Sequence, residues 1–319
     1  MRPERQKKFQ SVLIVLCLLI GRLAIQQAAA QEPAPQTKPE AAVQQRPAFP
    51  KIPVDPRVQI RSYLFKDTNE TIEYALFVSS KVSKDKKNPL IVTLHGLGAG
   101  PTIMLRGNAL DLAEEGGYIL VGPMGYNIRG WYGIPMGKAP SFAKAPPKTA
   151  DSTAAAQPNG DTAKKPKPSV FYDPNDPPNL RELSEKDVMN VLDIIRKEFN
   201  VDERRIYLMG HSMGGAGALY LGVKYPSIWA AIAAIAPAAF SLDPDMLKTV
   251  RHLPVMIVQG EKDNLVPVAN TRRWVDKLKE LNMTYEYLEI PGGDHGSVIL
   301  DGNPAIYAFF SRHSKPPSN

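Results

Sequence analysis

The chain has 319 residues, of which 43% are hydrophobic, so it can form one larger α/β domain with a sizeable core. Its formal net charge is +7, but residues 1–30 contribute +4 of this, and the rest is spread thinly along the chain. The sequence shows no basic stripe interleaved with aromatic residues, which argues against nucleic-acid binding.

The first 30 residues have the pattern of a secretory signal peptide. A basic start precedes an apolar run at 12–20, and Ala28 and Ala30 fit an A-x-A cleavage site. The alternative is a signal anchor that stays in the membrane, but the apolar run is short for a span. We therefore expect cleavage after Ala30, no stable membrane span afterwards, and a secreted or periplasmic protein.

Cysteine usage excludes several kinds of site. Cys17 is the only cysteine and lies within the expected signal peptide. The mature chain would then contain no disulfide, no thiolate metal site and no catalytic cysteine. No His and Asp cluster has the spacing of metal ligands, so neither a metal nor another cofactor is expected.

Two proline-rich stretches interrupt the chain. Residues 31–56 contain seven prolines and about 138–178 contain nine, and neither stretch shows apolar periodicity. We interpret the first as a tether and the second as a low-complexity insertion in an α/β domain at 57–319. The insertion is either a lid over the active site or a disordered loop, and the lack of an apolar face favours the loop.

The remaining sequence alternates apolar strands with amphipathic helices, which predicts the α/β class: a mostly parallel sheet with helices on both faces. The first two strands alternate in polarity and suit an antiparallel hairpin at an edge. The expected strands are 58–64, 71–78, 90–94, 118–121, 205–209, 230–235, 255–259 and 285–290. The expected helices lie near 103–115, 184–198, 213–224, 268–280 and 303–312, with Ser184 as an N-terminal cap.

A G-x-S-x-G motif at 210–214 lies between an expected strand and an expected helix. This is the position of a nucleophile elbow, in which the serine adopts a strained backbone and the flanking glycines avoid clashes with neighbouring backbone. The alternative is a glycine-rich packing turn. The strand–turn–helix context favours Ser212 as a nucleophile.

A nucleophilic serine needs a base. His295 lies in a loop directly after the last expected strand, where it can reach the carboxyl edge of the sheet. His211 adjoins the serine but should point away from it, and His95 begins a glycine-rich turn. His252 precedes a strand and His313 lies in the tail, so His295 is the expected base.

The orienting acid should come from the strand between the serine and the histidine. Asp263 follows that strand and gives the order Ser, Asp, His along the chain. Glu261 is the nearest competitor, and Asp243, Asp245 and Asp294 are others. We expect Asp263 to orient the base.

Two backbone N–H groups should form an oxyanion hole. One is that of Met213, at the start of the helix after the elbow. The other is that of Leu97, in the glycine-rich loop 95–100 after the third strand. A phosphate-binding loop is the rival interpretation, but this loop lacks the lysine and hydroxyl residue of a P-loop.

The motifs LHGLG, GHSMGG, GEKDNLVP and GGDHG resemble, in order and context, the α/β-hydrolases of the prolyl oligopeptidase and dienelactone hydrolase group. The chain is most similar to single-domain extracellular esterases of the feruloyl esterase and polyhydroxyalkanoate depolymerase types, over roughly 58–312. The resemblance implies acyl-enzyme chemistry, with Ser212 as nucleophile, His295 as base and then acid, and Asp263 orienting it. Prolyl oligopeptidases carry a large propeller before the catalytic domain. Here fewer than sixty residues separate the expected cleavage site from the first hydrolase elements near Pro89, which argues against a peptidase function.

The leading functional hypothesis is a hydrolase of carboxylic esters on small-molecule or polymeric substrates. The same residues would serve a peptidase on short peptides or an acyltransferase to a sugar hydroxyl, and a non-catalytic binding protein is disfavoured by the complete triad. Trp131 and Tyr132 either line the substrate pocket or anchor the insertion.

Overall fold

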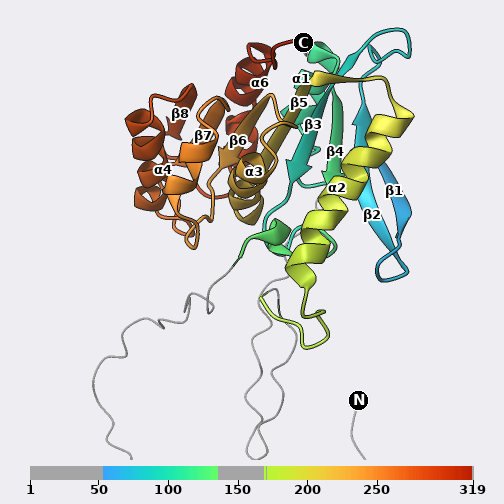
Figure 1. Ribbon diagram of the computed structural model, residues 1–319, viewed down its shortest axis with the longest axis horizontal. Helices are drawn as coiled ribbons and strands as arrows, with labels where there is room; N and C mark the ends of the chain where they lie inside the picture. Colours follow the sequence, from blue (N-terminus) through green and yellow to red (C-terminus); the bar gives the residue numbers. More distant parts are fainter. Residues whose placement is uncertain (1–52, 136–168, 170, 318–319) are drawn as a thin grey trace, which may run out of the picture. The chain divides into compact units, whose positions relative to one another are not determined.

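The structure, a computed structural model, describes residues 53–135, 169 and 171–317 (Figure 1). The expected signal peptide at 1–30, including Cys17, lies outside the described residues. So do most of the tether at 31–56 and most of the insertion at 138–178.

Within the described residues, eight strands form one sheet in the order β1-β2-β4-β3-β5-β6-β7-β8 (Figure 1). β1 pairs antiparallel with β2 and β2 antiparallel with β4, whereas the other neighbours are parallel. The predicted edge hairpin and mostly parallel sheet are therefore confirmed. The strands are β1 Gln59–Phe65, β2 Glu70–Val78, β3 Asn88–Leu94, β4 Ile119–Pro123, β5 Val201–His211, β6 Ala231–Ile235, β7 Val255–Gly260 and β8 Tyr285–Ile290.

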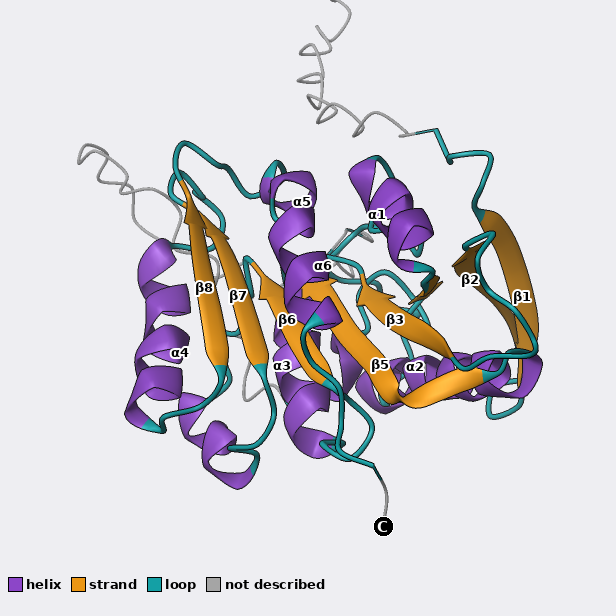
Figure 2. Ribbon diagram, turned by 90° about the horizontal axis from the view of Figure 1, so that it is seen from above, coloured by secondary structure: helices purple, strands orange, loops and turns teal. Residues whose placement is uncertain are grey.

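The helices cover the sheet from both sides (Figure 2). They are α1 Asn108–Gly116, α2 Leu180–Glu198, α3 Met213–Lys224, α4 Val268–Glu280, α5 Val298–Asp301 and α6 Asn303–Ser311, with short 3-10 turns η1 Trp131–Gly133 and η2 Pro244–Thr249. One apolar cluster joins the sheet to α2, α3 and α4, and the other joins it to α1, α5 and α6. Successive residues of β3 alternate between the two clusters because strand side chains alternate between faces.

Two helix starts differ from the prediction. α2 begins at Leu180, so Ser184 lies inside the helix and does not cap it; its buried hydroxyl accepts a hydrogen bond from the N–H of Tyr132 at 3.1 Å. α1 begins at Asn108, because Gly107 adopts a positive φ of 55° and the residues before it form turns. In both cases a tertiary contact or a backbone turn overrides the local pattern.

Candidate active site

Ser212 occupies the sharp turn between β5 and α3, with φ 56° and ψ −115°. Residues other than glycine rarely adopt these φ and ψ angles, and doing so costs conformational free energy. Three hydrogen bonds hold the turn: the Ser212 N–H donates to the Ile235 carbonyl at 2.9 Å, and its own carbonyl accepts from Ala216 and Ala238. The strained serine therefore stands at the carboxyl edge of the central strands.

Both glycines of the motif are required by close backbone approach. A Cβ atom at Gly214 would lie 2.1 Å from the Leu94 carbonyl oxygen. A Cβ atom at Gly210 would lie 2.1 Å from the Gly214 carbonyl oxygen. The predicted reason for glycine on either side of the serine is confirmed.

Asp263 and His295 form a direct pair. Nδ1 of His295 lies 2.8 Å from Oδ2 of Asp263, and the aspartate side chain has no exposed surface. The other carboxylate oxygen, Oδ1, accepts from the N–H groups of Leu265 and Val266, and Oδ2 also accepts from the Gln259 amide at 3.1 Å. The carboxylate is thus fully hydrogen-bonded although it is buried.

Burial acts to raise the pKa of Asp263, but the hydrogen bonds from His295 and from the Val266 N–H outweigh it, so the pKa lies below its usual value. The aspartate is therefore ionised at neutral pH. It accepts the Nδ1 proton of His295, which leaves Nε2 of the imidazole with a lone pair that can take up a proton.

The competing carboxylates make other contacts. Glu261 accepts from the Gly292 N–H at 2.8 Å, and Asp294 accepts from N–H groups in its own turn. Asp243 and Asp245 belong to η2 and its N-terminal cap. Asp263 is the carboxylate that the structure brings to the His295 ring.

His211 connects Ser212 to the loop that carries His295. It directly precedes Ser212, its ring centroid lies 4.6 Å from that of His295, and its Nε2 lies 2.6 Å from the His295 carbonyl oxygen. The sequence offered no signal for this contact, which spans 84 residues. The contact places the loop that carries His295 beside the end of β5, which precedes Ser212.

The loop after β3 lies against Ser212. A Cβ atom at Gly96 would lie 3.3 Å from the Ser212 Cβ. The N–H of Leu97, in this loop, and the N–H of Met213, at the start of α3, form no hydrogen bond with another described residue. The segments that contain the two expected oxyanion donors therefore both adjoin Ser212.

Buried aromatic and polar groups hold the loop after β3 through hydrogen bonds. The Tyr132 hydroxyl donates to the His95 carbonyl oxygen at 2.9 Å, and the His95 ring nitrogens lie 2.8 Å from the Gly96 oxygen and 2.7 Å from the Met124 oxygen. Burial lowers the pKa of His95, so its neutral ring donates to one of these two oxygens at a time. Tyr132 has no exposed surface, so its ring is not available to a substrate in this structure, whereas Trp131 is partly exposed.

An ion pair ties the end of the insertion to the loop after β4. The Arg129 guanidinium donates to both carboxylate oxygens of Asp176 at 2.7 Å, and Asn127 donates to the same carboxylate at 2.8 Å. Such bidentate contacts fix orientation as well as distance. The described flank of the insertion is thereby held beside Trp131.

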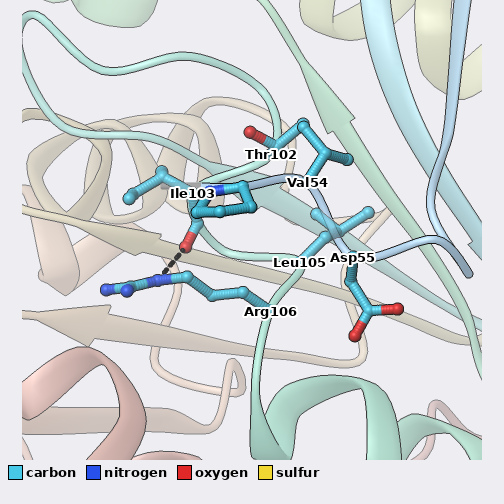
Figure 3. A pocket seen from close by; sticks show the side chains of 7 residues that line it. Val54, Asp55, Thr102, Ile103, Leu105 and Arg106 are labelled. Carbon is cyan, nitrogen blue, oxygen red and sulfur yellow. Dashed lines mark hydrogen bonds between the residues drawn. The ribbon is translucent and has the colours of Figure 1, made fainter. Parts of the chain in front are cut away.

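Other binding features are sparse in the described part of the chain. Residues 53–135, 169 and 171–317 hold no group of side chains suited to a metal ion and no helix long and apolar enough to cross a membrane. Figure 3 shows a small pocket between the segment before β1 and the turns before α1, where the Arg106 Nε donates to the Ile103 carbonyl at 3.0 Å. Neither Ser212 nor His295 lines this pocket.

Comparison with known sequences points to esterases. A family model described as "Putative esterase" matches residues 157–297. The match covers less than half of the chain, but it includes Ser212, Asp263 and His295. Feruloyl esterase B of Piromyces equi is 35% identical over 82 residues, covering 24% of this chain and 15% of that protein. Cutinase 2 of Thermobifida cellulosilytica is 30% identical over 95 residues, covering 30% and 34%. The chain thus spans about a third or less of the length of these curated relatives.

Comparison with solved structures covers more of the chain. The ferulic acid esterase of Anaeromyces mucronatus, solved with ferulic acid, superposes with a TM-score of 0.56 at 17% identity, over 80% of this chain and 90% of that one. At this identity the likeness shows the fold. The resemblance to esterases that the motifs indicated is confirmed, and the chain has the α/β-hydrolase fold.

Proposed function

We propose that this chain is a serine hydrolase of carboxylic esters, with Ser212 as nucleophile, His295 as base and Asp263 as the orienting acid. The observation that carries the proposal is the Asp263–His295 pair, joined at 2.8 Å at the sheet edge where the strained Ser212 stands. A buried carboxylate that holds the Nδ1 proton of a histidine prepares the other nitrogen to accept a proton. The matches to esterase sequences and folds favour an ester as the substrate.

The proposed reaction has two steps. His295 Nε2 takes the proton of the Ser212 hydroxyl as its oxygen bonds to the ester carbonyl carbon, and the N–H groups of Leu97 and Met213 bind the resulting oxyanion. The tetrahedral intermediate then expels the alcohol, which receives the proton from His295, and leaves an acyl-serine. Water attacks the acyl-serine with His295 again as base, and the carboxylic acid and free serine are released.

We propose Trp131 as one wall of the acyl pocket, since it keeps exposed surface beside the loop that supports Leu97. An aromatic wall would suit a flat or hydrophobic acyl group. The names of the relatives, which include feruloyl esterase and cutinase, agree with such a group.

The test is a panel of nitrophenyl esters of increasing acyl length, run beside aminoacyl nitroanilides on the full chain. We expect turnover of esters, covalent labelling by a fluorophosphonate, and a loss of at least about 10⁴-fold in kcat in Ser212→Ala. Ester turnover that survives in Ser212→Ala would refute the assignment. Turnover of nitroanilides with little on esters would indicate a peptidase, and ester products formed with added sugar would indicate an acyltransferase.

We also propose that the protein is exported. The basic start, the apolar run at 12–20 and the Ala28 and Ala30 pair support a signal peptide cleaved after Ala30. The mass of the protein recovered from an exporting host tests this, because cleavage would remove 30 residues.

A further inference from the structure

One ring nitrogen of His211 forms a hydrogen bond with the loop that carries His295. Its Nε2 lies 2.6 Å from the His295 carbonyl oxygen. A carbonyl oxygen only accepts hydrogen bonds, so Nε2 of His211 must carry the proton. The residue is 7% exposed, and its ring centroid lies 4.6 Å from that of His295.

This imidazole stays neutral. Burial, with the nearby His295 as the next cause, lowers the pKa of His211 to about 3; Arg106 acts in the same direction and Asp263 opposes it. His211 therefore offers an uncharged donor over the whole working range of a serine hydrolase. Its Nδ1 lies 3.3 Å from the place of a Cβ atom at Gly96, so the ring also packs beneath the loop that carries Leu97.

The loop that carries His295 needs such support. Residues 291–297 include three glycines, of which Gly292 has a φ of 70°. The Lys262 N–H donates to the Gly293 carbonyl at 2.8 Å, and Asp263 holds the His295 ring. Both of these contacts come from the loop after β7, whereas the contact from the nucleophile's own strand comes from His211.

We propose that His211 is a positioning residue, which sets the distance between the base and the nucleophile by holding the His295 main chain to the residue next to Ser212. This inference rests on the proposed function. Because His211 is covalently bonded to Ser212, a single hydrogen bond connects the two catalytic residues through the backbone. A displacement of the base by about 1 Å can cost about 10²-fold in rate.

Three variants distinguish the positioning role of His211 from effects of side-chain volume and from defects in folding. His211→Leu fills the space without a donor, His211→Asn keeps a polar group that is too short to reach the carbonyl, and His211→Gln places an amide N–H near Nε2. We expect kcat to fall by about 10- to 100-fold in the Leu and Asn variants, with KM within about threefold, and to return to within about threefold of the parent in the Gln variant. His252→Leu, at an exposed histidine, is the control and should keep the parent kcat.

The pH profile and hydrogen exchange supply independent readouts. Because His211 is neutral, the acid limb of kcat/KM should keep its midpoint in every variant. Amide exchange of residues 291–297 should speed up in the Leu and Asn variants and stay at the parent rate in the Gln variant. Parental kcat in His211→Leu, equal losses in the Gln and Leu variants, or unchanged exchange would each overturn the inference. Exchange tests it even if the parent turns over no ester, a result that would refute only the proposed function.

Discussion

Asp187 provides a sharp test of the electrostatics of this fold. This carboxyl lies on α2 with no exposed surface, and accepts hydrogen bonds from the Tyr63 hydroxyl at 2.5 Å and the Tyr126 N–H at 3.1 Å. Burial raises its pKa from 3.8 to about 6, although these hydrogen bonds act to lower it. Through Tyr126 the same carboxyl holds the loop that also contains Trp131.

The direction of the pH dependence follows from that pKa. Between pH 3.8 and about 6 the folded protein keeps a proton on Asp187 that the unfolded chain has lost, so stability falls as pH rises through this window. The difference between the two pKa values corresponds to about 3 kcal/mol in the free energy of unfolding. Asp187→Asn removes this titration, because an amide has no proton to lose.

The assay is urea unfolding of the parent and Asp187→Asn at intervals from pH 3.5 to 7.5. We expect the stability of the variant, relative to the parent, to increase by about 3 kcal/mol from the acid to the neutral end. Any change in hydrogen bonding adds a constant offset, which does not affect the slope. Asp193→Asn, at an exposed position on the same helix, is the matched control. A parent–variant difference that is flat across this range would refute the reasoning.

Two further predictions concern the site. Asp263→Asn should lower kcat by about 10³- to 10⁴-fold in the ester assay. The amide oxygen would stay with the N–H groups of Leu265 and Val266, so the amide NH2 would donate to Nδ1 of His295 and favour the wrong tautomer. Asp243→Asn should leave kcat unchanged, and an equal loss in both would contradict the assignment. Gly214→Ala should lower the melting temperature or prevent folding, since its Cβ would lie 2.1 Å from a carbonyl oxygen, whereas Gly100→Ala, with no atom within 4 Å of the added Cβ, should melt like the parent.

The strands and the pairing of Asp263 with His295 could be predicted because each depends on local signals. β3 is buried along its whole length, and its mainly apolar sequence is typical of a parallel strand covered on both faces. Parallel strands bring their carboxyl ends to one edge, so residues that follow β5, β7 and β8 must meet there. That rule led to the choice of Asp263 and His295, whose side chains lie 2.8 Å apart in the structure.

The supporting contacts could not be predicted, because they join segments that are distant in sequence and irregular in structure. Ser184 has the appearance of a helix cap, yet its hydroxyl is used by Tyr132, 52 residues away. Tyr132 itself adopts a positive φ of 52° within a turn that α2 covers. Hydrophobic periodicity along the sequence cannot predict a contact with a loop, because the path of the loop is not encoded in that pattern.

His211 shows where the argument from local geometry fails. Because successive residues of a tight turn were expected to point apart, the sequence argument excluded His211 as the base for Ser212. In the structure the His211 ring reaches the loop that carries His295, with Nε2 2.6 Å from the His295 carbonyl oxygen. A residue next to Ser212 can therefore act on the loop that carries His295. The middle residues of such elbow motifs are thus candidates for positioning the base, and the hydrogen-bond partner of each indicates whether it does so.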